Sequence, residues 1–216
     1  MPSNSFTPGT LDAVRPHPPT DLICFSHLRW RFVTQRPQHL LTRAARTYRV
    51  FYWEEPVWHP AGEIADPQSP VPGARLEIVE EGPSLWVLRP HLTHGLDPDA
   101  AQRALLDRLL ATARITHFVR WYYTPMALGF SAHLHAAATV YDCMDELSHF
   151  LNAPPSLTAR ERELFRLADV VFTGGISLYE AKREQHPNVF AFPSSIDVPH
   201  FAHARTPQPD PPDQAH

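Results

Sequence analysis

The chain has 216 residues, of which 43% are hydrophobic, and a formal net charge of −4. This length and apolar content suffice for one domain with a sizeable core and exclude a disordered chain, while the absence of a basic block excludes broad nucleic-acid binding. No window reaches the length of a membrane span, and the N-terminus lacks the basic start and apolar run of a signal peptide. We therefore expect a cytoplasmic protein.

Proline-rich polar segments flank the body of the chain. Residues 1–19 and 204–216 are too poor in apolar side chains to fold alone, so we expect a disordered N-terminal tail and a linker. The body at 20–203 contains both cysteines, Cys24 and Cys143, in predicted strands or at their ends. This placement is typical of reduced, buried thiols in a cytosolic protein.

Strands and helices alternate through the first half of the body. The apolar run at 21–26 predicts a strand covered on both faces, and 36–48 has the spacing of an amphipathic helix with a proline in its first turn. A second strand is predicted at 48–55, followed by the turn-rich insertion WHPAGEIADPQSPVPGA. Residues 75–90 predict two short strands around a Gly-Pro turn, arranged as a hairpin.

The alternation continues to the end of the body. Asp97 or Asp99 is expected to cap a helix over AAQRALLDRLLATA. Four later strands are predicted: 115–123, 169–174, 188–193 and a segment that includes Thr139, Val140 and Tyr141. The later predicted helices are 125–136, 156–168 and 177–186, and we expect Ser177 to cap the last of them. Such alternation predicts an α/β fold, a Rossmann-like and mainly parallel sheet with helices on both faces.

Three segments in a fixed order resemble a known family: FSHLRWRFVTQRPQHL, DVVFTGGISLYEAKR and NVFAFPSSIDVPHF. Together they resemble the N-terminal domain of GT-B fold glycosyltransferases, the family 4 and family 1-like group that builds bacterial surface polysaccharides. The last segment is similar to the family's turn before its second domain, with Ser194 and Ser195 in place of the usual Asn-Gly.

The resemblance implies one half of a two-domain enzyme. The domain at 20–203 would be the acceptor side, 204–216 the interdomain linker, and the donor-binding domain would be absent. The implied reaction transfers a sugar, with retention, from a nucleotide-sugar, UDP- or GDP-linked and bound mainly by the second domain, to a saccharide or lipid-linked acceptor. We expect no further cofactor and no nucleic-acid partner; peripheral contact with the inner face of a membrane is compatible with this reading.

Basic side chains follow the first predicted strand. Ser26, His27, Arg29 and Arg36 lie on the loop and helix start, where backbone N–H groups and guanidinium groups suit a phosphate. The resemblance places the same loop near the donor diphosphate and the acceptor. The alternative is a solvated basic loop.

Acidic side chains follow the strand that includes Tyr141. We expect Asp142 or Asp145 to contact the acceptor hydroxyl as a base or hydrogen-bond acceptor, the position at which the resemblance implies a polar residue. The alternative is an Asp that caps the next segment. Glu146 is expected to be solvated, and a paired-carboxylate hydrolase is a rival chemistry.

Aromatic residues end the preceding strand. Trp121 and Tyr123 are candidates to stack on sugar rings, with burial in the core as the alternative. No HExxH motif and no Cys/His set has metal-ligand spacing, so we expect no bound metal. Two other functions remain open: a non-catalytic module that pairs with a full-length transferase, and a dehydrogenase, which the lack of a GxGxxG motif after the first strand disfavours.

Overall fold

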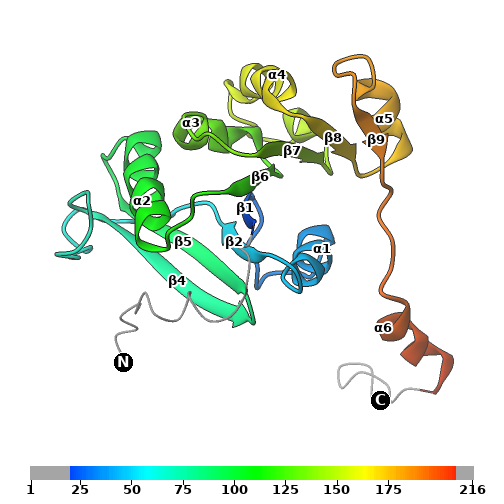
Figure 1. Cartoon of the computed structure of the whole chain (residues 1–216), viewed down its shortest axis with the longest axis horizontal. Coiled ribbons are helices and arrows are strands. Elements are labelled where there is room, and N and C mark those ends of the chain that lie inside the picture. Colours follow the sequence, from blue (N-terminus) through cyan, green and yellow to red (C-terminus); the bar gives the residue numbers. More distant parts are fainter. Residues whose placement is uncertain (1–19, 208–216) are drawn as a thin grey trace.

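The computed structural model describes residues 20–207 and shows a mostly parallel α/β fold of the Rossmann-like kind (Figure 1). Its nine-stranded sheet has the order β3-β5-β2-β1-β6-β7-β8-β9, with β4 antiparallel to β5 and every other pair parallel. The strands are β1 Asp21–Phe25, β2 Arg49–Trp53, β3 Val57–His59, β4 Ala74–Gly82, β5 Leu85–Thr93, β6 Phe118–Tyr122, β7 Ala138–Cys143, β8 Val170–Thr173 and β9 Val189–Ala191. The predicted fold class and the β4–β5 hairpin are therefore confirmed.

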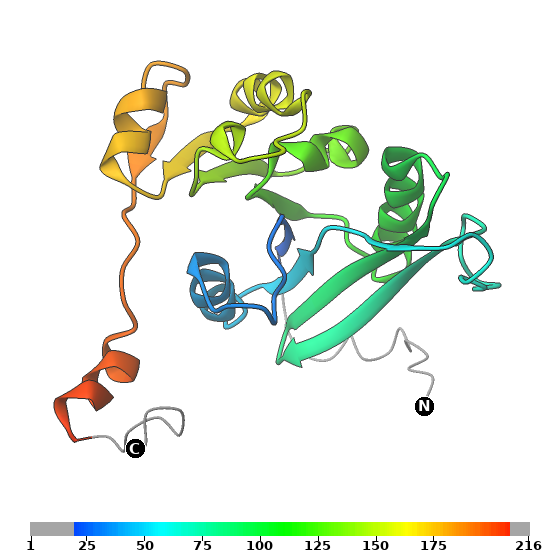
Figure 2. The same cartoon turned by 180° about the vertical axis from the view of Figure 1, so that it is seen from behind.

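Helices cover both faces of the sheet, as Figure 1 and its reverse view in Figure 2 show. The helices are α1 Arg36–Ala44, α2 Pro98–Thr112, α3 Leu128–Ser131, α4 Leu157–Leu167, α5 Ile176–Lys182 and α6 Val198–Ala202. The alternating side chains of β1 divide the core. Ile23 and Phe25 pack with residues of α2, α3 and α4, whereas Leu22 and Cys24 pack with Leu41 of α1.

The helix predicted at 125–136 is much shorter in the structure. A 3₁₀ turn at Pro125–Ala127 precedes the single turn of α3. Beyond it, His133 bonds Asp107 of α2 at 2.7 Å and Ala137 N donates to Phe118 O at 2.8 Å. These contacts turn the chain back into the sheet before the helix can continue.

The predicted helix caps have different outcomes. Asp97 caps α2, because its carboxylate accepts from the backbone N–H groups of Asp99 and Ala100. Ser177 does not cap α5, since the helix already includes Ile176 and Gly175 occupies the cap position without a side-chain bond. The segment after β7 packs closely against this point, since a Cβ on Gly174 would lie 2.9 Å from Met144 O.

The sheet has its topological switch point at β1. The chain adds β2 on one side of β1 and later adds β6 on the other. Backbone bonds join the three strand ends: Ser26 N donates to Trp53 O at 3.0 Å, and Tyr123 N donates to Phe25 O at 2.8 Å. Ligands of open α/β sheets bind beside the carboxyl ends of strands at such a point.

An arm leaves the body after β9. Its start is held by bonds from Phe192 N to Thr173 O and from Ser194 N to Gly174 O, and it continues to α6, which hangs apart from the sheet in Figure 1. The predicted N-terminal tail at 1–19 and the end of the predicted linker, 208–216, lie outside the described residues. In the part of the chain that is described, no helix has the length and apolar character needed to cross a bilayer.

Candidate functional site

The predicted residues Arg36 and Asp142 form a buried ion pair. Arg36, the first residue of α1, places its Nε 3.0 Å and 3.1 Å from the two carboxylate oxygens of Asp142 in β7. Asp142 is fully buried, and its burial raises the pKa of the carboxyl above its usual value despite the opposing effect of Arg36. Arg36 also donates from Nη1 to Phe192 O at 2.5 Å. The pair therefore connects α1, β7 and the start of the arm.

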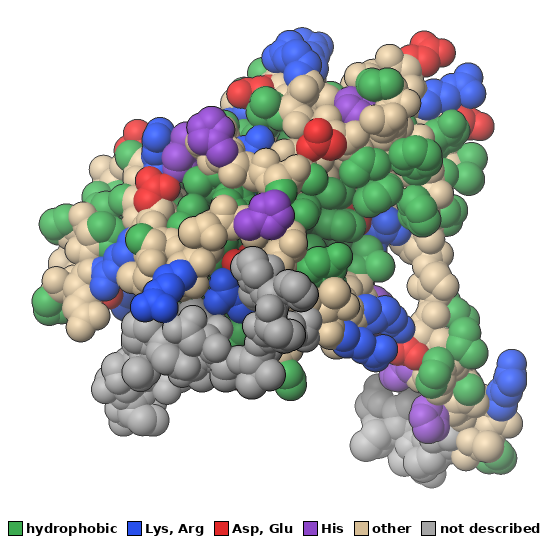
Figure 3. All heavy atoms as spheres, viewed as in Figure 1, with side chains coloured by type: hydrophobic (Ala, Val, Ile, Leu, Met, Phe, Trp, Pro, Cys, Tyr) green, Lys and Arg blue, Asp and Glu red, His purple; other side chains and the backbone are tan. Residues whose placement is uncertain are grey.

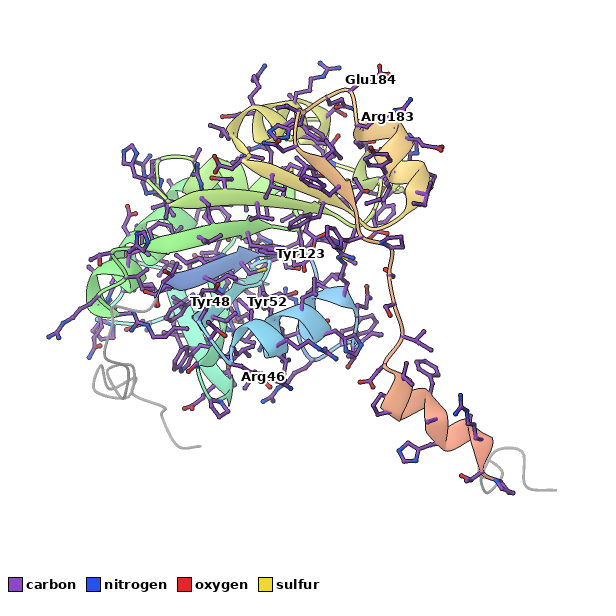
Figure 4. All side chains as sticks on the ribbon, turned by 45° about the vertical axis from the view of Figure 1, so that its right-hand side comes forward. Arg46, Tyr48, Tyr52, Tyr123, Arg183 and Glu184 are labelled. Carbon is purple, nitrogen blue, oxygen red and sulfur yellow. The ribbon has the colours of Figure 1, made fainter. Side chains whose placement is uncertain are left out.

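Three other predicted residues gather around this pair on the α1 side of the sheet. Tyr123 and Trp121 follow each other at the end of β6, with ring centroids 6.4 Å apart, and both lower the pKa of Asp142. Figure 4 places Tyr123 with Tyr52 on the side of the sheet that faces α1, where both belong to one core cluster. Within the described residues, the buried polar atoms without a hydrogen-bond partner are Tyr123 OH, Trp121 Nε1 and His27 Nδ1.

His27 and Asp145 lie at the outer side of this group. Burial lowers the pKa of His27, while the charge of Asp145 and the backbone of Tyr123 oppose that change. Asp145 is half-buried, and its carbonyl accepts a bond from Cys143 Sγ at 3.5 Å. Tyr123 and Trp121 lie close enough to Asp142 to lower its pKa, but their polar atoms form no hydrogen bond of ordinary length. Unsatisfied buried polar groups are rare in native proteins, so a hydroxyl or a water bound at these atoms would satisfy them.

The predicted residue Arg29 forms a second ion pair, with the buried carboxylate of Glu54. Its Nη1 donates to Glu54 Oε2 at 3.1 Å and to the Glu55 carbonyl, and its Nη2 donates to the Pro56 carbonyl at 3.2 Å. Glu54 is fully buried and also accepts from Arg89 Nε at 2.7 Å. The Arg29 guanidinium thus fastens residues 54–56, and both predicted phosphate ligands, Arg29 and Arg36, are already engaged by carboxylates.

A cavity of about 400 Å³ opens at the carboxyl ends of β1, β2 and β6. This lies in the range of about 300–1,000 Å³ typical of small-molecule sites. The predicted residue Ser26 lines it; its Oγ also accepts from Leu28 N at 3.1 Å. The aromatic wall consists of Phe25, Trp53, Trp58 and Phe130, and the other polar lining residues are Glu54, Glu55, Asp99, Gln102 and Thr124.

Sequence reasoning did not select the acids of this cavity. Glu54 and Glu55 directly follow β2, just as Asp142 and Asp145 stand at the end of β7 and beyond it. The rule that marked the later acids, a carboxylate at the carboxyl end of a parallel strand, applied equally to YWEEP. Glu55 is exposed, but partial desolvation of its carboxyl raises the pKa despite the nearby Arg29, as is frequent for carboxyl groups in functional sites.

Glu146 differs from its expected role as a solvated side chain. Its carboxylate accepts from Lys182 Nζ at 2.8 Å, and the same ammonium donates to Glu161 at 2.9 Å. Lys182 is buried at the end of α5, so this cluster ties the segment after β7 to α4 and α5. Among residues 20–207, no group of three or more His, Cys, Asp or Glu side chains is arranged to hold a metal ion.

Comparisons with known proteins inform the fold. No protein-family model matches the sequence, and no curated protein matches it significantly. The structure is similar to sucrose-phosphate synthase from Thermosynechococcus elongatus, with a TM-score of 0.57 at 10% sequence identity. The match covers 87% of this chain and 53% of that chain, so the chain spans about half the length of its structural neighbour.

At this low identity the similarity establishes the architecture alone. The chain has the α/β Rossmann-like fold that forms one half of a GT-B structure. Because one fold hosts many activities, the function must be argued from the site.

Proposed function

We propose that the chain is the acceptor-side half of a GT-B glycosyltransferase, which transfers a sugar from a nucleotide-sugar to a saccharide or lipid-linked acceptor. The observation that supports this most is the cavity at the switch point of the sheet, which combines aromatic walls with carboxyl, amide and hydroxyl groups. Aromatic faces can cover the apolar face of a sugar ring, and the polar groups can bind its hydroxyls.

The predicted residues take different parts in this proposal. Ser26 lies in the acceptor cavity itself. His27, Trp121, Tyr123 and Asp145 lie around the unpartnered polar atoms, which are on the α1 side of the sheet, and a reacting hydroxyl or the transferred sugar would be held there. Arg29, Arg36 and Asp142 act by positioning, because their charged groups bond to one another or to buried protein groups.

The nucleotide-sugar, UDP- or GDP-linked, would bind mainly to a second domain. The 216-residue chain is then expected to bind UDP-glucose or GDP-mannose weakly and to transfer sugar poorly or not at all, in the cytoplasm or at the inner face of a membrane. The test compares this chain with the chain joined to a donor-binding domain, using labelled nucleotide-sugars and a panel of saccharide acceptors. Efficient transfer by the 216-residue chain alone would contradict the proposed division of labour.

A second candidate, a non-catalytic module that pairs with another protein, is favoured by exposed apolar residues. Phe190 and Phe192 at the β9 end of the sheet are each about half exposed, and Figure 3 shows hydrophobic side chains gathered over this part of the body. Ile196, Val198 and Phe201 on the arm are also exposed. Absence of transfer with every donor and acceptor, combined with stable association with a full-length transferase, would favour this candidate.

A further inference from the structure

The cavity wall has acidic side chains and no basic ones. Its charged lining residues are Glu54, Glu55 and Asp99, and the described lining contains no Lys, Arg or His. A site that binds a phosphate normally presents guanidinium, ammonium or backbone N–H groups to the anionic oxygens. The side chains that line the cavity therefore offer a phosphorylated ligand no cation.

The three arginines that bond to acids of the cavity wall are already engaged by protein groups. Arg29 bonds to Glu54 and to two backbone carbonyls, and Arg89 donates to Glu54 at 2.7 Å and to Glu77 at 3.1 Å. On the opposite wall, Arg160 donates to Asp99 at 2.7 Å and to Met126 O at 3.2 Å. Glu54 is fully buried, so turning Arg29 or Arg89 toward a ligand would remove one of its two guanidinium partners, which is unfavourable for a buried charge.

Glu55 differs from the other two acids. Its backbone carbonyl is fixed by Arg29, but within the described residues its carboxylate forms no hydrogen bond or ion pair. An unengaged carboxyl group on the wall of a cavity can bind one or two ligand hydroxyls. The same group repels a ligand phosphate.

Trp58 supplies an aromatic surface next to Glu55. It lies on β3, which pairs with β5 at the edge of the sheet, and its side chain lines the cavity. His94 stacks on the indole with a ring-centroid distance of 5.6 Å and an interplanar angle of 10°, which supports it from one side. A supported aromatic ring beside hydrogen-bond acceptors suits an uncharged polyhydroxylated ring.

We propose that this cavity selects an uncharged sugar unit over a phosphorylated one, with Glu55 and Trp58 as the residues that determine this specificity. The proposal rests on the proposed acceptor-binding function. It refines that function by stating that the unit of the acceptor held between β1, β2 and α2 bears no phosphate group.

Isothermal titration calorimetry and saturation-transfer NMR on the full 216-residue chain test this proposal. The probes are glucose, galactose and mannose, each compared with its own 6-phosphate. We expect at least one free sugar to bind about tenfold more tightly than its phosphate, because a like charge next to the ligand has an effect of this order even at an exposed residue such as Glu55. Glu55→Gln should bring the two affinities within about threefold of each other, and Trp58→Ala should weaken the free sugar about tenfold, with Trp58→Phe intermediate.

Glu184→Gln is the matched control, because it removes the same charge from an exposed position beyond α5 (Figure 4). It should leave both affinities unchanged. Circular dichroism and urea unfolding would confirm that each variant is folded, and Glu55→Asp, which keeps the charge, should retain the discrimination. The proposal is overturned if the sugar phosphates bind as tightly as the free sugars, if Glu55→Gln leaves their ratio unchanged, or if no free sugar binds.

The result is separable from that of the transfer assay. Transfer to a phosphorylated sugar seated in this cavity would overturn the specificity while leaving the transferase function intact. Conversely, selective binding of free sugars without transfer by the two-domain protein would support the specificity and contradict the transferase function.

Discussion

Arg36 Nε lies 3.0 Å and 3.1 Å from the two carboxylate oxygens of Asp142, a residue 106 positions later in the chain. The pair lies where α1 begins and where β7 leaves the sheet, and Arg36 also bonds to the carbonyl of Phe192 at the start of the arm. One buried charge pair thereby fixes the relative positions of three segments that border the candidate site.

Removing Arg36 should strongly destabilise the protein. Arg36→Met leaves the fully buried Asp142 carboxylate without its partner, and the expected loss in free energy of unfolding is about 3–5 kcal/mol. Arg31→Met is the matched control, since Arg31 pairs with Glu81 at an exposed position and its loss should cost less than about 1 kcal/mol. Urea denaturation would measure both, and the double variant Arg36→Met with Asp142→Asn should recover part of the loss. Equal effects of the two single variants would contradict the structural role of the pair.

Lys182 should be equally important at the other end of the sheet. Lys182→Met leaves the carboxylates of Glu146 and Glu161 facing each other, and we expect a loss of about 3–5 kcal/mol in the free energy of unfolding. The neighbouring Arg183, which is exposed and labelled in Figure 4, provides the control Arg183→Met. Thermal and urea unfolding of the two variants should differ clearly; a stable Lys182→Met protein would show that the cluster is not needed for folding.

Arg29 should act as a positioning residue for the cavity. Arg29→Lys keeps the positive charge, but an ammonium cannot reproduce the planar set of bonds to Glu54, Glu55 and Pro56. We expect a stability loss of about 1–3 kcal/mol together with weaker sugar binding. Arg43→Lys, which changes a guanidinium with one exposed bond to His39, should alter neither measurement. An unchanged stability combined with loss of nucleotide-sugar binding would instead assign Arg29 to a phosphate.

Stability should decrease as the solution becomes acidic, in part because of His91. Its Nδ1 lies 2.8 Å from His59 Nε2 and its Nε2 lies 3.0 Å from Glu77, while Arg75 adds a nearby positive charge. Burial lowers the pKa of His91 below its ordinary value, so the unfolded chain binds this proton more tightly than the folded protein does. The stabilisation is therefore complete above about pH 6.5 and is lost as the pH falls below that value.

Urea unfolding at about pH 7.5 and about pH 5.5 would measure this dependence. His91→Gln should reduce the difference between the two free energies. His27→Gln should act in the same direction, because burial lowers the pKa of His27 as well. The exposed His135 provides the control His135→Gln, which should leave the difference unchanged. A difference that is identical in all three variants would contradict the assignment.

Much of the fold was predictable from local pattern. The apolar runs at 21–26 and 48–55 and the segment that includes Tyr141 became β1, β2 and β7, and the predicted α/β class is confirmed. Short-range signals suffice here because a parallel strand must be apolar on both faces and a covering helix must be apolar on one. Element ends were less predictable, as the shortened α3 shows, because contacts from distant segments decide where a helix stops.

The candidate site was only partly accessible to such reasoning. The edge of the sheet was predictable, and the predicted residues His27, Trp121, Tyr123 and Asp142 do gather there. The phosphate-binding role of Arg29 and Arg36 stays a prediction from the sequence, and their ion pairs with Glu54 and Asp142 could not be foreseen. The partners are 25 and 106 residues away, and no local rule pairs charges across such separations.

The amino-acid sequence alone specifies the alternation of strands and helices, and with it the class of fold and the edge of the sheet at which a ligand would lie. These follow from side-chain periodicity and strand polarity, which are properties of short segments. Which acids face the cavity and which are paired with arginines is visible only in the three-dimensional structure, because it depends on the side chains that the strand order brings together. Glu54 and Glu55 are adjacent in the chain. The Glu54 carboxylate is buried between two arginines, whereas Glu55 lines the cavity and its carboxylate is paired with no described residue.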